Sequence, residues 1–335
     1  MSHAPGTGTP LPSRPSPGVK QGIRTGCDRG IRRGLHGFWW IVKILVPVSL
    51  AVALLDWTGW LYALDPVFSP VMALMNLPPQ AALPLLSALF SSFYAAVGMM
   101  VVIPFTSAQF ILMSVFISIA HMIIVEGLIQ HKAGIHIALI SGIRLLTAGV
   151  AVYLVSQFFP GTETPVVMPE SIGQHLPLAQ ALLAWTESTL RLMLKIVAII
   201  VPVMMLLETL RELGLTERIG TAFRPVMVLL GLSPNVATMW VTGAFFGIVY
   251  GSAVIVEEAN SGRFARDELE RLHISLGISH SMVEDPALFL ALGVGLQWSV
   301  IPRLLASALV VHTYRLTLWL KARGKARALP QGQPL

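Results

Sequence analysis

Charged residues and cysteines are scarce in this chain of 335 residues. Only 12% of the residues are charged, whereas about a quarter are charged in typical water-soluble domains. Hydrophobic residues make up 54% of the chain, and the mean hydropathy is +0.71. This composition excludes a water-soluble globular protein. It is explained by several apolar segments of about 20 residues, each able to cross a bilayer.

The lack of cysteine and of familiar catalytic motifs narrows the function. Cys27 is the only cysteine, so an internal disulfide and a cysteine-based metal site are excluded. The sequence has no Gly-rich nucleotide-binding loop, no His-Glu-x-x-His, no EF-hand spacing and no Gly-x-Ser-x-Gly. We therefore expect neither an enzyme nor a cofactor. The energy for moving a solute would come from an ion gradient, a partner or downhill flow.

Positive charge is concentrated at the two ends of the chain. The formal net charge is +6; residues 1–36 carry six Lys and Arg against one Asp, and residues 312–335 carry five with no acid. Basic ends beside apolar segments are typical of cytoplasmic ends, and they also attract anionic lipid, so nucleic acid is not needed to explain them. The first apolar run, 38–55, ends in Asp56-Trp57 rather than a cleavage site, which indicates a retained span.

The chain contains eight apolar segments that form two similar sets of four. They lie at about 38–55, 80–103, 108–127, 134–158, 187–210, 236–256, 272–285 and 287–312. A shift of 155 positions pairs Pro47 with Pro202, and a shift of 159 pairs His121 with His280 and Arg144 with Arg303. Matches of proline, histidine and arginine in register indicate an internal duplication.

This duplication predicts the organisation of the chain. We expect two membrane repeats with a linker between them and a tail at each end. In chain order these are a disordered basic cytoplasmic tail (1–36), repeat 1 (37–158), an extracytoplasmic linker (159–186), repeat 2 (187–312) and a basic cytoplasmic tail (313–335).

The loop charges favour inverted repeats. If all eight segments crossed, the copies would be parallel and the basic stretch 211–224 would lie outside the cytoplasm. If the third segment of each repeat turned back, six segments would cross and every loop would obey the rule. The segment 272–285 would reach only about 21 Å across a core of roughly 30 Å, although 108–127 is long enough to span by itself. We predict an all-α polytopic membrane protein with two inverted repeats, each with one broken or re-entrant segment.

The densest polar cluster in an apolar setting lies in the second repeat. His280 and Glu284 are four residues apart and would share a helix face, and Asp285 precedes a proline in a helix-start pattern. The first repeat has a reduced counterpart in His121 and Glu126. Ionisable groups inside a membrane are typical of functional sites, so we predict that these five residues bind the solute. The alternative is that they cap helix ends at the membrane surface.

Other residues are weaker candidates. Arg144 and Arg303 would neutralise the carboxylates or reach the surface by snorkelling. Asn235 and Gln297 are candidate hydrogen-bonding partners of a polar solute. Small residues at every fourth position favour close helix packing, and these are Gly243, Gly247 and Gly251.

Two stretches of the second repeat resemble a known family. The residues 277–293, Gly-Ile-Ser-His-Ser-Met-Val-Glu-Asp-Pro-Ala-Leu-Phe-Leu-Ala-Leu-Gly, and 245–253, Phe-Phe-Gly-Ile-Val-Tyr-Gly-Ser-Ala, are similar to the nucleoside-recognition, or Gate-domain, membrane proteins of bacteria. The Gate module is similar to parts of concentrative nucleoside transporters and of ferrous-iron transport protein B. This chain lacks a GTPase domain, so nucleotide-driven iron transport is not implied.

These observations lead to a functional hypothesis with alternatives. We expect a transporter or permease for a small polar solute, and the resemblance implies a nucleoside or nucleobase. The His and carboxylate residues also suit a divalent metal such as iron or zinc, so a metal permease is an alternative hypothesis. A non-transporting membrane scaffold is the third hypothesis. We expect the protein to lie in the bacterial cytoplasmic (inner) membrane with both ends in the cytoplasm. The sequence is compatible with both a monomer and a homo-oligomer.

Overall fold

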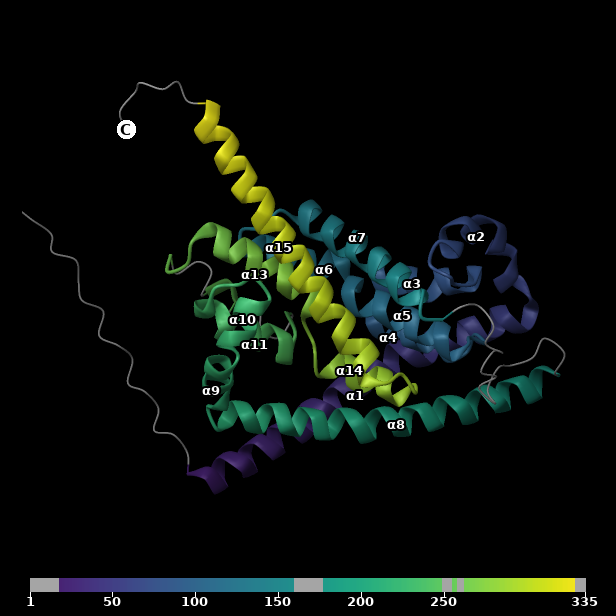
Figure 1. Cartoon of the computed structure of the whole chain (residues 1–335). Helices are drawn as coiled ribbons and strands as arrows, with labels where there is room; N and C mark the ends of the chain where they lie inside the picture. The colour runs from purple at the N-terminus through teal and green to yellow at the C-terminus, as the bar shows by residue number, and fades with distance from the viewer. Residues whose placement is uncertain (1–17, 160–176, 249–254, 258–261, 329–335) are drawn as a thin grey trace, which may run out of the picture.

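The structure is a computed structural model that describes residues 18–159, 177–248, 255–257 and 262–328. Every regular element in these residues is a helix, as the composition predicts (Figure 1). In the first half these are α1 (Val19–Thr58), the 3-10 helix η1 (Trp60–Leu64), α2 (Asp65–Ala73), η2 (Pro79–Ala81), α3 (Ala82–Phe90), α4 (Phe93–Met100), α5 (Ser107–Ala120), α6 (Ile123–Lys132) and α7 (Ile137–Ser156). In the second half they are α8 (Leu178–Glu212), α9 (Leu215–Ala222), α10 (Arg224–Leu229), η3 (Pro234–Val236), α11 (Ala237–Phe246), α13 (Arg266–Ser279), α14 (Glu284–Ala291) and α15 (Leu296–Ala328).

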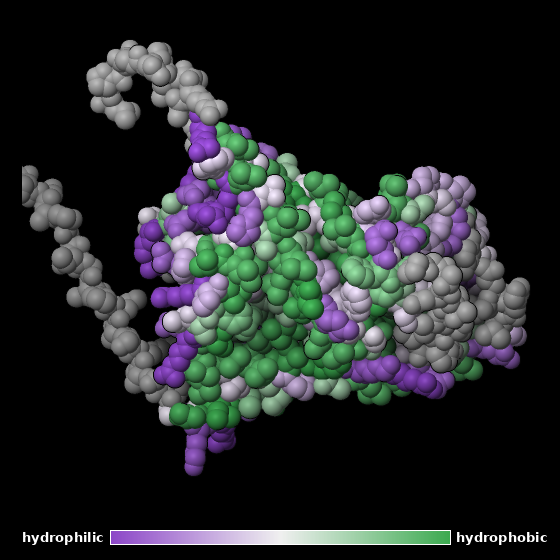
Figure 2. Space-filling view, viewed as in Figure 1, coloured by the Kyte–Doolittle hydropathy of each residue, from purple (hydrophilic) through white to green (hydrophobic). Residues whose placement is uncertain are grey.

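Four helical segments of the described chain are long and apolar enough to cross a membrane. They are α1, the segment Ser107–Lys132 that contains α5 and α6, α7 and α8. Figure 2 shows a broad apolar surface over the middle of one face, with polar residues gathered at its margins. An apolar outer surface of this kind is what a bilayer core requires of a helical protein.

The longest helices, α1 and α8, pack against each other along the lower edge of the molecule (Figure 1). Their contacts show an antiparallel pair, because residue numbers fall along α8 as they rise along α1. Glycines at every fourth position of α1 face the α8 residues in this order: Gly22 and Leu213, Gly26 and Thr209, Gly30 and Met205, Gly34 and Val201. Without side chains at these positions the two backbones approach closely.

The predicted disorder of residues 1–36 is wrong from Val19 onward, because α1 begins there. The stretch has few apolar residues, which suggested a solvated tail. Its contacts with α8 instead use glycine backbone and ion pairs of Arg29 with Glu212 and of Arg33 with Glu208, and these require no apolar side chains. Helix also replaces part of the predicted linker, since α8 begins at Leu178, and most of the predicted C-terminal tail, since α15 ends at Ala328.

In the first half, the second apolar segment is divided into two short helices. Helices α3 and α4 pack against one another as a hairpin. The turn between them is made by Ser91, where α3 ends, and Ser92, whose side chain accepts a hydrogen bond from the backbone of Ala95. The hydroxyl of Ser92 thus satisfies a backbone N–H that the helix break leaves without an intrahelical partner.

The third apolar segment of the first half is a helix broken at His121, which is one of the two forms predicted for it. Helix α7 passes antiparallel along α6 and then α5: Ile137 at its start faces Gly127 of α6, and Arg144 bonds to the carbonyl of Ile119 in α5. Helices α14 and α13 lie along α15 in the same order. The central helices α5 and α13 are buried along most of their length, and they position the candidate site.

Candidate functional site

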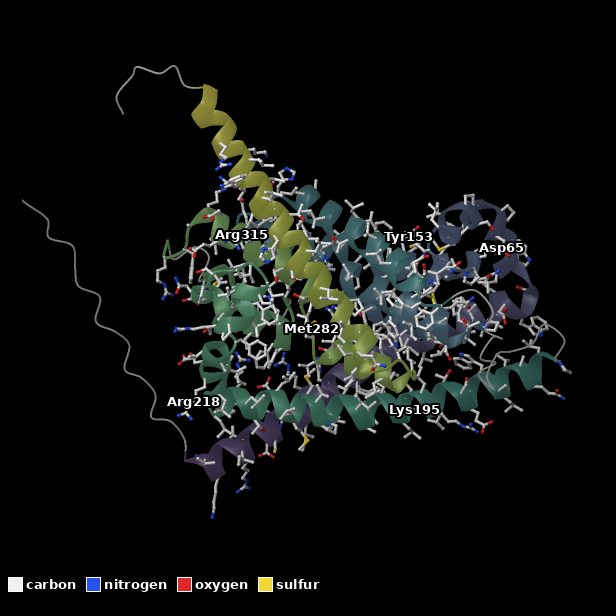
Figure 3. The ribbon with its side chains drawn as sticks, viewed as in Figure 1. Asp65, Tyr153, Lys195, Arg218, Met282 and Arg315 are labelled. Atoms are coloured by element: carbon white, nitrogen blue, oxygen red, sulfur yellow. The ribbon has the colours of Figure 1, made fainter. Side chains whose placement is uncertain are left out.

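Helix breaks in the two halves create the candidate site. Helix α5 ends at His121, which is extended, and Met122 then adopts a left-handed conformation with φ 46°. Helix α13 ends at His280 in the same way, and Ser281 follows with φ 49°. Non-glycine residues rarely adopt such a conformation, and it concentrates at functional positions. Figure 3 shows Met282, next to the second break, in the middle of the molecule.

The helix break in the first half is stabilised by a backbone hydrogen bond to the α3–α4 hairpin. The backbone N–H of Met122 donates to the carbonyl of Ala88, near the end of α3, at 2.8 Å. At the second break the N–H of Ser281 donates to the carbonyl of Gly243 in α11 at 3.4 Å. Backbone groups released by each break are thus satisfied by a neighbouring helix, which is the condition for irregular backbone inside a membrane.

Three buried side chains meet where the breaks approach each other. The Nε2 atoms of His121 and His280 are 3.2 Å apart. The Oε1 atom of Glu126 lies 3.3 Å from the Nε2 of His121 and 3.0 Å from that of His280. Exposures of these residues are only 4%, 2% and 1% for His121, Glu126 and His280. We call this group the central cluster.

The orientation of both imidazole rings is fixed by the helix that precedes each break. The Nδ1 atom of His121 lies 2.8 Å from the carbonyl oxygen of Ile117, and that of His280 lies 2.9 Å from the carbonyl oxygen of Leu276. A carbonyl oxygen only accepts hydrogen bonds, so each Nδ1 carries the proton. Each Nε2 atom therefore faces the central cluster.

A buried arginine supports the break in the first half. Arg144 of α7 donates from Nε to the carbonyl of Ile119 at 2.9 Å and from a terminal nitrogen to that of His121 at 2.7 Å. The same side chain lies 2.8 Å from Oε2 of Glu126. Carbonyls at the end of a helix lack intrahelical partners, and the guanidinium satisfies two of them while pairing with the carboxylate.

The second half repeats this arrangement with Arg303 of α15. Its Nε donates to the carbonyl of Ile278 at 3.2 Å, and a terminal nitrogen donates to the carbonyl of His280. The partner carboxylate is Asp285, 3.4 Å away. Both arginines are buried, with 1% and 0% exposure, so neither snorkels to the surface.

The comparisons with known proteins agree with the sequence resemblance. Residues 193–309 match the family model described as Gate, nucleoside recognition. The second half of the chain carries a Gate domain. The chain is also similar to the uncharacterized membrane protein YvoD of Bacillus subtilis (strain 168), with 26% identity over 294 residues, which cover 85% of this chain and 94% of that protein. No solved structure matches the chain. The chain is therefore a membrane protein with a Gate domain.

The Gate domain contributes only part of the central cluster. His280, Asp285 and Arg303 lie within the matched residues, whereas His121, Glu126 and Arg144 belong to the first half. The cluster therefore depends on contact between the Gate domain and the half that the family model does not match.

The two acidic residues predicted beside His280 pair with side chains outside the central cluster. Asp285 pairs with Arg303, and Glu284 accepts a hydrogen bond from the hydroxyl of Tyr94 at 2.6 Å. The expectation that Glu284 shares a helix face with His280 is wrong, because the helix stops at His280 and starts again at Glu284. Sequence reasoning missed Tyr94; its signal was a phenol two residues after Ser92 in an apolar run.

Two other candidates in the Gate domain, predicted as hydrogen-bonding partners of a polar solute, lie outside the central cluster. Asn235 is exposed on η3. Gln297 is exposed at the start of α15, where it lines an apolar groove between α7 and α15. Both lie in turns or first helical turns, which place them near helix ends rather than at the central break.

The small residues of the Gate domain pack helices together. A side chain at Gly243 would meet Leu276 of α13 at 2.7 Å, so glycine permits the contact of α11 with α13. Gly247 ends α11 with φ 80°, and a side chain there would lie 2.7 Å from the hydroxyl of Ser281. Gly251 lies outside the described residues.

Proposed function

We propose that this protein is a transporter whose two halves are inverted copies, and that its solute crosses where the two helix breaks meet. The observation that carries the proposal is the central cluster, which is buried inside the apolar protein and takes residues from both halves. Intramembrane ionisable groups are expensive to insert, by about 2.5–3.5 kcal/mol each on insertion scales. Such groups at broken helices are the usual form of a transport site.

The duplication is supported by the positions of the helix ends. Helices α5 and α13 begin and end 159 residues apart, and η2 and η3 are 155 residues apart at both ends. The left-handed residues Met122 and Ser281 also stand 159 apart, as do Gly134 and Gly293. Equal spacing of helix ends and of unusual backbone conformations is expected when one fold is used twice.

Inversion is supported by the directions of equivalent helices. Helices α1 and α8 are equivalent under the 155-residue offset and pack antiparallel. Equivalent spans of parallel repeats would run in the same direction through the bilayer. We assign to each half a span (α1 or α8), a broken span (α5–α6 or α13–α14) and a last span (α7 or α15), and an odd number of crossings inverts the second copy. In this arrangement the α3–α4 hairpin enters and leaves the membrane on the same side, so it does not alter the number of crossings.

Orientation, location and solute class belong to the same proposal. The basic ends favour cytoplasmic termini in the inner membrane of a bacterium. The Gate description refers to nucleosides, and this chain's solute is a small polar molecule of that kind or a cation. Because the central cluster is buried, the two halves must move relative to each other before a solute enters or leaves.

Uptake by purified protein in lipid vesicles tests the proposal. A thermal-shift screen against nucleosides, nucleobases and divalent metals first identifies a solute, since a ligand raises stability in proportion to RT ln(1 + [L]/Kd). We expect Glu126→Gln and His280→Ala to abolish uptake of that solute. The control is His273→Ala, which removes a buried histidine of α13 outside the cluster.

Two results would contradict the proposal. Uptake by both cluster variants at the wild-type rate would remove the site from the pathway. No uptake of any screened solute, with a phenotype that depends only on the basic ends, would favour the membrane scaffold.

A further inference from the structure

We infer that His121, Glu126 and His280 form a binding site for one divalent first-row transition-metal ion, with Zn²⁺ and Fe²⁺ as the best matches. The inference has two parts: that the metal binds, and that it is the transported solute. Only the second part rests on the proposed function. Binding of the metal is measured without transport, so the two claims can fail separately.

The first argument is that the central cluster consists of electron-pair donors. Each histidine carries its proton on Nδ1, where a backbone carbonyl accepts it, so each Nε2 presents a lone pair. The Oε1 of Glu126 presents another at 3.0 Å and 3.3 Å from these nitrogens. Three such atoms repel one another unless a cation lies among them. A proton or a metal ion meets this requirement.

The second argument is the size of the triangle that the three atoms form. Its sides are 3.0, 3.2 and 3.3 Å. Ligands about 2.1 Å from a first-row metal are about 3.4 Å apart in a tetrahedral site and about 3.0 Å apart when adjacent in an octahedral one. An ion placed about 1 Å out of the triangle's plane would therefore reach all three atoms at ordinary distances, with little movement of the side chains.

The third argument is the set of contacts behind the ligand atoms. Metal-binding histidines usually donate their other N–H to a carbonyl or carboxylate, and ligating carboxylates are themselves hydrogen-bonded. Both histidines donate their Nδ1–H to a backbone carbonyl, and a terminal nitrogen of Arg144 lies 2.8 Å from the second oxygen of Glu126. These contacts orient all three ligands before any ion arrives.

The ligand set also indicates how the ion is held. Two imidazoles and one carboxylate suit zinc and iron, and no thiolate is present in the group. Three protein ligands leave at least one coordination position free for water or another exchangeable ligand, unlike a closed structural site. An open site of this kind allows the ion to be released.

The charges around the cluster fit reversible binding. Arg144 and Arg303 are buried nearby and oppose a cation, while Glu126, Asp285 and Glu284 provide three carboxylates. The balance of these five groups is one negative charge. A divalent ion is thus neither excluded by the arginines nor held by a large excess of acid, which suits passage rather than permanent storage.

The test measures metal binding to the full chain in detergent. Zn²⁺ is titrated by calorimetry, and Co²⁺ is titrated by its visible absorption, which reports nitrogen and oxygen ligation. We expect one ion per chain. Each of His121→Ala, His280→Ala and Glu126→Gln should weaken binding by at least about 100-fold, the upper range for changes behind a ligand. His273→Ala, the control on α13, should bind like the wild type.

Glu126→Gln keeps the assay informative if an alanine variant fails to fold. Its amide matches the carboxylate in shape and can donate to Nε2 of His280 with its oxygen beside Arg144, so the fold should persist while the metal is lost.

Several outcomes overturn the inference. These are no Zn²⁺ or Co²⁺ binding by the wild type, binding unchanged in Glu126→Gln, or equal losses in the variants and the His273→Ala control. The first of these would leave a shared proton as the cation in the cluster. Metal binding without metal uptake in vesicles would overturn the transport function alone, whereas uptake of a nucleoside without metal binding would overturn the metal site alone.

Discussion

The close approach of α1 and α8 makes a quantitative prediction about Gly30. A Cβ atom at this position would lie 2.3 Å from the Cα and 2.7 Å from the backbone nitrogen of Met205. Ordinary contact begins at 3.4 Å, so Gly30→Ala must separate the helices by roughly 1 Å. The obstacle is backbone, which cannot rotate away as a flexible side chain does.

The expected loss of stability follows from this separation. A radial gap of about 0.5–1 Å forfeits roughly a quarter to a half of the dispersion energy at each affected contact. Overpacking of a rigid site typically lowers the free energy of unfolding by about 1–3 kcal/mol, and the backbone obstacle places Gly30→Ala at the upper end, about 2–3 kcal/mol. The ion pairs of Arg29 and Arg33 with α8 lie on either side of Gly30 and would weaken with it.

Gly37→Ala is the matched control on the same helix. A Cβ at Gly37 has no atom within 4 Å, so the change should be neutral or stabilise α1 by up to about 1 kcal/mol through helix propensity. Both variants are unfolded in the same detergent by heat or denaturant. Equal stability of Gly30→Ala and Gly37→Ala would refute the packing of α1 against α8, and with it the helical state of residues 19–36.

Two further predictions concern the same interface and the buried arginine. The Sγ of Cys27 lies 3.9 Å from the side-chain oxygen of Thr209, so Thr209→Cys should form an intramolecular disulfide with Cys27 under mild oxidation, seen as a mobility shift that reductant reverses; failure to cross-link would place the helices apart. Arg144→Met should lower the free energy of unfolding by about 3–5 kcal/mol because it removes the arginine from the buried carboxylate of Glu126, whose other contacts are the two histidines, and adding Glu126→Gln should recover part of this loss. An undiminished stability of Arg144→Met would contradict the ion pair.

The central cluster could be found from the sequence because the duplication marks it. His121 and His280 stand at matching positions in apolar surroundings, and Glu126 follows the first of them. What the sequence did not reveal is how the chain turns at these points. The break at His121 and Met122 contains neither glycine nor proline, and only the structure shows that Arg144 takes over the released carbonyls.

The hairpin of α3 and α4 could not be predicted from the sequence for a related reason. The run 80–103 is long and apolar enough to read as a simple span, and Ser91-Ser92 is its one pair of adjacent hydroxyl residues. The side chain of Ser92 satisfies the backbone N–H of Ala95, which allows α4 to start as a second short helix. Hydrophobicity measures how much of a segment enters the membrane and does not report whether the segment crosses.

Helix α1 shows a third limit of sequence analysis. The low apolar content of residues 19–36 is typical of a solvated tail, yet the glycines at every fourth position form a surface for another helix. The spacing becomes informative only once α8 is known to supply the backbone that fits against it.

The sidedness of two equivalent positions tests the inverted arrangement most directly. His131 and Leu290 are both exposed and stand 159 residues apart, at the ends of α6 and α14. In a background of Cys27→Ala, His131→Cys and Leu290→Cys are made separately and treated in intact cells with a thiol reagent that does not cross the membrane, and again after permeabilisation. Inverted halves predict that one variant is labelled in intact cells and the other only after permeabilisation. Labelling of both variants from the same side would contradict the account.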